Sequence, residues 1–316
     1  MFMDFVFLFI ACAFFALQFI FQKLFEQRTI GGFSVSLWNQ IVSCIAGMVF
    51  LLLKTIGTPA EAVTGAAFLY ALLYSASGII CSTATLLAMG CGKVNSVGTY
   101  CLAGGMIVPF LYGILALNEE AGLFKWIGIL VLCASLIPSV MGNDEKNGGK
   151  INVRFVVYVS LVFLTNGLVS VFSKMHQISP AAMSEDGFLM LGSVIRFTAV
   201  LVIMLFMAAV KKSNGDRSAY RDTFWNISKK KMTGILFIVL IAFASATAVC
   251  NTIGNLFSLR CMLTMDASIQ FPILSAVVII LTALFGRIFF GEKITRGSAV
   301  SLLMSAAGIG LFMIPV

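Results

Sequence analysis

The sequence predicts an all-α membrane protein with ten transmembrane helices, arranged as two inverted five-helix repeats around a central cavity. Three observations lead to this prediction: the composition, ten long apolar runs, and a series of features that recurs in both halves of the chain. Sixty per cent of the 316 residues are hydrophobic and 11% are charged, whereas soluble domains carry about 25% charged residues. A chain this apolar cannot cover its surface with polar groups in water, so we expect it to lie in a bilayer.

Ten apolar runs reach the roughly 20 residues that a helix needs to cross a bilayer. In lipid each backbone polar group must be bonded within its own segment, which favours helices over open strands. The runs are also too long and too uniformly apolar for the alternating strands of a barrel. We therefore predict transmembrane helices over residues 4–23, 35–54, 66–90, 96–117, 124–141, 154–174, 187–210, 233–257, 266–289 and 298–315.

The ten runs divide into a first repeat over residues 1–141, a linker over 142–152 and a second repeat over 153–316. In each half the first run ends near a lysine, the fourth contains a proline and precedes an acidic turn, and the fifth ends in Ile-Pro. The corresponding pairs are Lys23 and Lys174, Pro109 and Pro272, Glu119 and Glu292, and Pro138 and Pro315. A duplicated unit with an odd number of spans must lie upside down relative to its copy, an arrangement that recurs in transporters.

Three local patterns resemble the drug/metabolite transporter superfamily, in its ten-helix EamA-type branch. Lys23 and Lys174 look like the family's helix-1 lysine, and Arg196 looks like its arginine early in the second helix of a repeat. The segment Phe290-Gly291-Glu292-Lys293-Ile294-Thr295 is similar to its Gly-Glu-basic-x-Thr turn before the last helix. The resemblance implies a ten-helix fold and transport of a small molecule, with a cargo that varies among amino acids, nucleotide sugars, cations and drugs. Four-helix relatives use a helix-1 glutamate for proton coupling, whereas this chain has Gln18 and Gln22.

Polar side chains at helical spacing within the runs predict surfaces that face the protein interior, because polar groups are costly in lipid. Thr247, Asn251 and Asn255 share one helix face by their spacing. Each such stripe either lines a binding pocket or bonds helices together, and both interpretations stay open. We predict a substrate site formed by Gln18, Gln22, Trp38, Asn39, Tyr74, Tyr100, Asn166, Lys174, Arg196, Asn251, Asn255 and Gln270.

Arg196 is the most informative single residue, because it lies about ten residues, or ~15 Å, inside the seventh run. A charge at that depth indicates a functional site; the alternatives are that it extends to a headgroup or pairs with Glu185 or Asp186. No acidic residue lies deep in any run, so a buried base favours a substrate with a carboxylate or another anion. The aromatic candidates Trp38 and Tyr74 either offer flat faces to a substrate or anchor the helices at the membrane interface.

Glycines and prolines in the fourth and ninth runs predict gates or kinks beside the site. Gly104, Gly105 and Pro109 lie in the fourth run, and Pro272 lies in the ninth. Interrupted helices at corresponding positions are typical of transporter gates, although a static kink is the alternative. Small residues at spacings of four in the last run, which begin at Gly297, predict close packing or a homodimer through the fifth or tenth helix.

The function we predict is secondary transport of a small metabolite by alternating access, with an amino acid or related organic anion favoured. The alternatives are export of cationic or aromatic compounds by the same fold, and a membrane-embedded enzyme that acts on lipid-linked substrates. The eight cysteines and the lone His176 form no metal-binding or disulfide pattern, and the chain has no GxxxxGK[ST] phosphate-binding loop. We therefore expect no enzymatic activity, metal or cofactor. The basic residues flank apolar runs, which favours contact with membrane lipids over nucleic acid.

Two arguments about orientation disagree. Of the 21 lysine and arginine residues, 16 lie in or beside the odd-numbered connections between runs, four lie at the other side, and Arg196 lies within a run. The positive-inside rule then places the 211–232 connection in the cytoplasm and both termini outside. The resemblance implies termini inside.

Overall fold

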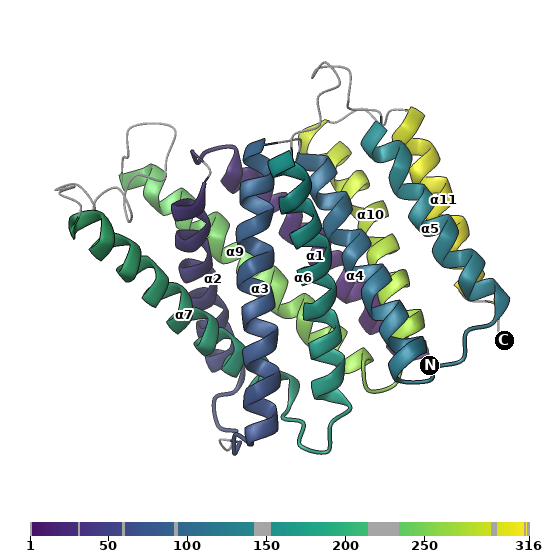
Figure 1. Ribbon diagram of the computed structural model, residues 1–316, viewed down its shortest axis with the longest axis horizontal. Helices are drawn as coiled ribbons and strands as arrows, with labels where there is room; N and C mark the ends of the chain where they lie inside the picture. Colours follow the sequence, from purple (N-terminus) through teal and green to yellow (C-terminus); the bar gives the residue numbers. More distant parts are fainter. Residues whose placement is uncertain are drawn as a thin grey trace.

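The computed structural model describes residues 2–30, 32–58, 61–91, 94–141, 153–213, 234–291, 296–312 and 314. Over these residues the chain is entirely helical apart from its turns and loops, and it forms ten α-helices (Figure 1). Their bounds are α1 Phe2–Glu26, α2 Phe33–Lys54, α3 Gly65–Cys91, α4 Val94–Ala116, α5 Leu123–Met141, α6 Val153–Gln177, α7 Glu185–Ser213, α9 Gly234–Cys261, α10 Ala267–Phe290 and α11 Arg296–Phe312. The predicted number of helices, ten, is confirmed over the described residues. The linker predicted over 142–152 lies outside the described residues.

The length and composition of these helices are typical of a membrane protein. Seven of the described helices are long and apolar enough to cross a bilayer: α1, α2, α3, α6, α7, α9 and α10. The apolar stretches within α4, α5 and α11 are shorter, at Tyr100–Ala116, Leu123–Ser135 and Leu302–Phe312. Large apolar side chains such as Leu115, Ile235 and Leu303 are more than 70% exposed, and an exposed apolar surface of this kind matches lipid rather than water.

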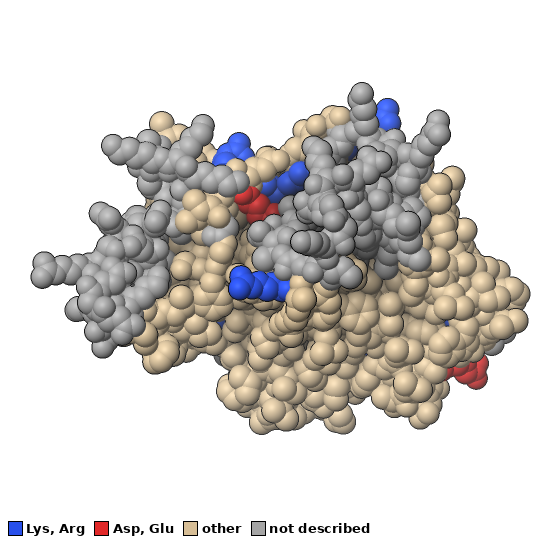
Figure 2. All heavy atoms as spheres, turned by 45° about the horizontal axis from the view of Figure 1, so that its top comes forward, with Lys and Arg blue, Asp and Glu red and all other residues tan. Residues whose placement is uncertain are grey.

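The helices run between two ends of the molecule, and successive helices alternate in direction (Figure 1). We call the end that carries residues 27–30, between α1 and α2, the linker end. The opposite end carries residues 55–58, between α2 and α3, and both chain termini, and we call it the terminal end. Figure 2 shows lysine and arginine atoms at the linker end above a broad belt of uncharged residues.

Each helix packs mainly against helices from the other half of the chain. Helix α1 lies against α9 and α10, whereas α6 lies against α3 and α4. Further contacts join α2 to α7, α4 to α10, and α5 to α11. The two halves are therefore interleaved rather than side by side.

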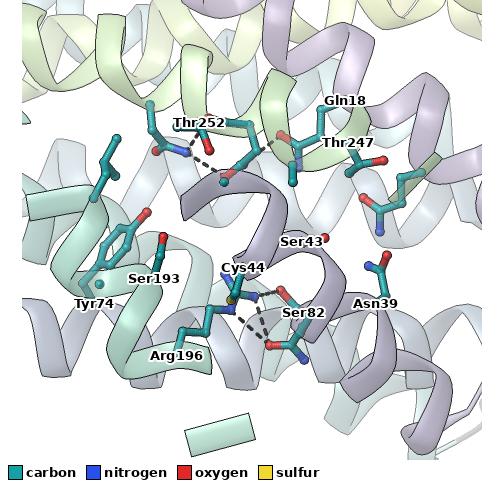
Figure 3. Close-up of a pocket in the computed structure, with 18 of the residues that line it drawn as sticks. Gln18, Asn39, Ser43, Cys44, Tyr74, Ser82, Ser193, Arg196, Thr247 and Thr252 are labelled. Atoms are coloured by element: carbon teal, nitrogen blue, oxygen red, sulfur yellow. Dashed lines mark hydrogen bonds between the residues drawn. The ribbon is translucent and has the colours of Figure 1, made fainter. Parts of the chain in front are cut away.

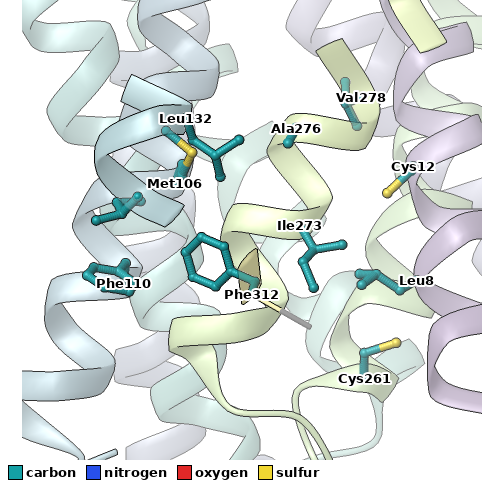
Figure 4. Close-up of a cluster of buried hydrophobic side chains, with 11 residues drawn as sticks. Leu8, Cys12, Met106, Phe110, Leu132, Cys261, Ile273, Ala276, Val278 and Phe312 are labelled. Atoms are coloured by element: carbon teal, nitrogen blue, oxygen red, sulfur yellow. The ribbon is translucent and has the colours of Figure 1, made fainter. Parts of the chain in front are cut away.

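The largest apolar cluster among the described residues joins α1, α4, α5, α9, α10 and α11 (Figure 4). Phe110 of α4 lies edge-on to Phe312 of α11 and to Trp126 of α5, with ring centroids 6.1 Å and 5.4 Å away. Leu8 and Ile273 extend the cluster to α1 and α10. Lipid tails are as apolar as these side chains, so the cluster stabilises the bundle through close van der Waals packing and not through transfer from water.

Small residues let α5 and α11 approach closely within one chain. A Cβ added at Gly128 would lie 2.8 Å from Phe312 Cε2, and one added at Gly308 would lie 2.6 Å from Leu132 Cδ2. The hydroxyl of Ser305 donates to the hydroxyl of Ser135 over 3.1 Å. The sequence predicted close packing or a homodimer through this small-residue face. In the structure, this part of the face on α11 packs against α5 of the same chain.

Glycines also allow α4 and α6 to cross with their backbones in contact. A Cβ added at Gly104 would overlap the carbonyl of Phe163, and one added at Gly105 would lie 2.7 Å from Asn166 Nδ2. Pro109 and Pro272 lie inside α4 and α10, and both helices continue through them. At these four predicted gate positions the structure thus has a close helix crossing and two prolines within continuous helices.

Candidate binding cavity

A cavity of about 140 Å³ lies at mid-depth among α1, α2, α3, α7 and α9 (Figure 3). It lies between two buried apolar clusters. At the linker end, Phe25, Trp38 and Ala244 belong to one cluster; at the terminal end, Leu51 and Leu259 belong to the other. On α2 and α9 the cavity-lining residues fall between the members of these clusters. The described lining residues are Gln18, Gln22, Asn39, Gln40, Ser43, Cys44, Gly47, Tyr74, Ser82, Leu86, Leu189, Gly192, Ser193, Arg196, Thr247, Ala248, Asn251, Thr252 and Asn255.

The lining is mostly polar, and its charge is positive. Among the described residues it holds six carboxamides, several hydroxyls and one charged side chain, that of Arg196. Polar groups that face a cavity inside a bilayer bundle are expensive unless they bond to one another, to water or to a ligand. This composition therefore suits a small hydrophilic ligand.

Arg196 reaches the cavity from the middle of α7 and is held by neutral acceptors. Its Nε and Nη2 donate to Gln40 Oε1 over 3.2 Å and 3.1 Å, and Nη2 also donates to the Gly78 carbonyl over 3.1 Å and to the hydroxyl of Ser82. No acceptor among the described residues binds Nη1. The guanidinium is thus fixed along one edge, and its other side remains available.

Two features of α2 and α3 place the guanidinium there. A Cβ at Gly78 would lie 3.4 Å from Arg196 Nη1, so the absent side chain lets the guanidinium lie against α3. Gln40 is 2% exposed, and its Nε2 donates to Ser36 and Thr83 hydroxyls over 3.3 Å and 3.2 Å. These two bonds orient the Gln40 oxygen toward Arg196.

The alternative that Arg196 pairs with an acid at the start of α7 does not hold in this structure. Asp186 bonds instead to the Lys54 ammonium, at 2.7 Å and 2.8 Å. Glu61 accepts a bond from the Ser184 backbone amide over 2.9 Å. Both contacts tie α7 to the α2–α3 connection at the terminal end, away from the guanidinium.

A second polar wall consists of carboxamides from α1 and α9 (Figure 3). Asn251 Nδ2 donates to Gln18 Oε1 over 2.9 Å, and Asn255 Nδ2 donates to Asn251 Oδ1 over 3.0 Å. This chain of amides is uncharged and keeps donors and acceptors on both sides. Thr252 lies beside it, where Gly47 of α2 leaves room: a Cβ at Gly47 would lie 3.2 Å from Thr252 Oγ1.

Two hydroxyls near Arg196 have no partner among the described residues. The ring of Tyr74 lies against α7 at Gly192, where an added Cβ would be 3.2 Å from Tyr74 Cδ1. Ser193 lies next to it, and Figure 3 shows both hydroxyls turned in the same direction. The carbonyl of Gly192 accepts a bond from Ser75 over 2.8 Å, which fixes α3 against α7. Tyr74, Ser193 and Arg196 Nη1 therefore offer three unused donors.

Seven of the twelve predicted substrate-binding residues line this cavity: Gln18, Gln22, Asn39, Tyr74, Arg196, Asn251 and Asn255. The other five lie elsewhere. Trp38 stacks on Phe25, with ring centroids 6.0 Å apart, in the apolar cluster at the linker end. Asn166 Nδ2 donates to the Cys101 carbonyl over 2.7 Å and joins α6 to α4. Tyr100 lies on α4 and is 37% exposed.

Lys174 and Gln270 bond to the region where α9 ends and α10 begins. Lys174 Nζ donates to the Met262 and Met265 carbonyls, both over 2.7 Å. Gln270 donates to the Ser258 carbonyl over 2.8 Å. The carboxylate of Glu119 accepts bonds from the backbone amides of Ala267 and Ser268, over 2.8 Å and 2.7 Å. A cation thus lies at the C-terminal end of α9 and an anion at the N-terminal end of α10, as the helix dipoles favour.

Several lining residues were absent from the predicted site. Gln40, Ser82, Ser193 and Thr252 line the cavity but are not among the twelve predicted residues. Single serines and threonines are common in membrane helices and give no signal by themselves. The spacing of Ser193 to Arg196, one helical turn, is the feature that could have identified it.

Comparison with known proteins supports the fold alone. No family model matches the chain, and no curated protein sequence matches it. Solved structures do match; one of them, described only as "Crystal structure of protein", has a TM-score of 0.68 at 10% sequence identity. The match covers 98% of this chain and 96% of the other. The likeness at this identity concerns the fold alone.

Proposed function

We propose that this protein is a secondary transporter that moves a small polar metabolite, an amino acid or a related organic anion, across a membrane by alternating access. The observation that carries the proposal is the polar cavity with Arg196 at mid-depth, lined by three helices of the first half and two of the second. A carrier needs a site that both halves share, because motion of one half against the other then exposes it to either side.

The proposal includes an inverted repeat, which the helix packing supports. If α1 corresponds to α6, and α3 and α4 correspond to α9 and α10, then the contacts of α1 with α9 and α10 match those of α6 with α3 and α4. The contacts of α2 with α7, α4 with α10 and α5 with α11 then join corresponding helices. Asn118 and Gly291, with φ of 54° and 63°, both precede an acidic residue after a corresponding helix.

The two apolar clusters suit the gates of such a carrier. Each lies toward one end of the cavity and contains side chains from both halves, such as Phe25 and Leu240 at the linker end and Leu51 and Phe188 at the terminal end. Rocking the halves would separate one cluster while the other stays packed. Close-packed clusters favour two discrete states over a continuous range.

The alternative cargo, a cationic or aromatic compound, has less support in the cavity. A cation would face Arg196 with no carboxylate among the described lining residues to offset it, and Tyr74 is the aromatic side chain in that set. A lipid-linked enzyme would need a nucleophile and a base in contact at a membrane interface. The cavity instead holds amides and hydroxyls at mid-depth.

Uptake into liposomes that contain the purified protein tests the proposal. Labelled amino acids, organic acids, nucleosides and quaternary amines are supplied in turn, and we expect saturable uptake that an unlabelled copy of the same compound inside the vesicles accelerates. Arg196→Ala should reduce the rate at least about tenfold, the effect of losing a charge-assisted bond. Arg260→Ala is the control, because Arg260 lies over the Phe7 ring at the terminal end of α9. Equal uptake by Arg196→Ala and the unchanged protein would contradict the role of the cavity.

A further inference from the structure

The charge balance of the cavity restricts its ligand further than the proposed function does. Arg196 brings one positive charge to mid-depth in the bundle, and no acidic residue is among the described residues that line the cavity. Asp186 bonds to Lys54, and Glu119 bonds to two backbone amides of α10. Glu26 accepts a bond from Gln22 over 3.2 Å at the linker end of α1. The guanidinium thus has hydrogen-bond partners that are all neutral.

An uncompensated charge enclosed by protein and lipid is unfavourable, because the lost hydration is not replaced. When both gates close around a ligand, the net charge of the enclosed site is that of Arg196 plus that of the ligand. A monoanion brings this sum to zero. A zwitterion leaves it at plus one, and a dianion brings it to minus one.

The geometry of the guanidinium also favours a ligand with a single negative charge. Gln40, Ser82 and the Gly78 carbonyl occupy Nε and Nη2, so a two-pronged bond along that edge is not available. Nη1 can bind one oxygen of a ligand, and the unpartnered hydroxyls of Ser193 and Tyr74 can bind the second. One Arg nitrogen with two hydroxyls suits a carboxylate better than a doubly charged phosphate, which is bound by several cationic groups.

The opposite wall recognises the rest of the ligand. The amide chain of Gln18, Asn251 and Asn255 is neutral, so it favours hydroxyl or carboxamide groups over charged ones. An apolar cavity of about 150 Å³ holds benzene, and this cavity of about 140 Å³ therefore fits a ligand of about six to ten non-hydrogen atoms.

We infer that the ligand is a small organic acid with one net negative charge, whose carboxylate binds Arg196 Nη1 and whose uncharged polar groups bind the amide wall. This inference rests on the proposed function in one respect, namely that the cavity is the transport site. The inference predicts that a hydroxy acid binds more tightly than an amino acid of the same size, whereas the proposed function makes no distinction between the two.

Four probes of similar size test the inference by calorimetry on purified protein: glycerate, serine, glyceramide and malate, with net charges of −1, 0, 0 and −2 at neutral pH. We expect glycerate to bind saturably and the other three at least about tenfold more weakly, since each leaves a charge or a bond unmatched. Binding of serine or glyceramide at least as tight as that of glycerate would overturn the inference. So would a failure of glycerate to bind.

Two variants show whether the charge of Arg196 sets this preference. Arg196→Gln should bind glycerate and glyceramide about equally, whereas Arg196→Lys keeps the charge and should keep the preference for the acid. If Arg196→Gln does not fold, as judged by gel filtration, binding of the four probes to Arg196→Lys still tests whether the positive charge sets the preference for glycerate. The same probes in liposomes separate the two proposals. Tight glycerate binding without uptake contradicts transport and leaves the ligand class intact, whereas uptake of serine in preference to glycerate contradicts the ligand class and leaves transport intact.

Discussion

At the scale of single residues, the arginine in α7 depends on a neighbour that carries no charge. Gln40 presents its oxygen to two nitrogens of Arg196 and is itself oriented by Ser36 and Thr83. A carboxamide satisfies the guanidinium without neutralising it. The positive charge therefore stays available for a ligand, which a carboxylate at the same position would not allow.

Gln40→Glu tests this directly, because the two side chains have nearly the same shape. The new carboxylate should pair with Arg196 and make the empty cavity neutral, so that affinity for glycerate falls at least about tenfold while affinity for glyceramide rises. Gln40→Leu is the control that removes the hydrogen bonds without adding a charge. It should lower the affinity for both probes, and glycerate should still bind more tightly than glyceramide. An unchanged preference for glycerate in Gln40→Glu would show that Gln40 does not control the charge of the site.

The sequence predicted Arg196 as a site residue but not its partners, for a physical reason. Depth along the helix follows from counting residues, since each adds about 1.5 Å. Which neighbouring helix faces a side chain depends on helix tilt and rotation, which the spacing of residues along the chain does not reveal. The same limit explains Trp38: its position near a helix start is clear from the sequence, but its stacking on Phe25 places it in the apolar cluster beside the cavity.

At the scale of helices, most of the fold could be predicted because the membrane sets element length and composition. The predicted spans agree with the observed helices within a few residues, for example 66–90 against Gly65–Cys91. The pairing of helices could not be predicted to the same extent. Small residues in the last run predicted close packing, and the structure assigns part of that face to α5 through Gly308 and Ser305.

The crossing of α4 and α6 yields the clearest prediction at this scale. Gly104→Ala would place a methyl group on the Phe163 carbonyl, which backbone cannot avoid without moving the helices apart. Overpacking of this kind costs about 1–3 kcal/mol or more, so we expect a lower unfolding temperature in a thermal-shift measurement. Gly98→Ala in the same helix is the matched control, because nothing lies within 4 Å of the added Cβ. Equal stability of the two variants would contradict the close crossing.

At the scale of the whole molecule, the distribution of charge predicts which end faces the cytoplasm. In the sequence 16 of the 21 lysine and arginine residues lie in or beside the odd-numbered connections. The described helices that flank these connections end at the linker end, and Figure 1 places both chain termini at the opposite end. Basic connections are retained on the cytoplasmic side during insertion. The charge count therefore places the linker end inside and the termini outside, against the orientation that the family resemblance implies.

Cysteine labelling in intact cells decides between the two orientations. Thr58 lies at the terminal end and Gln27 at the linker end, and both are exposed. With a maleimide that cannot cross the membrane, Thr58→Cys should react in intact cells, whereas Gln27→Cys should react only after permeabilisation. The unchanged protein is the control for its own cysteines, of which Cys12, Cys44 and Cys261 are buried. The reverse pattern would put the basic end outside, and the apolar cluster of Phe25 and Trp38 would then be the outer gate rather than the inner one.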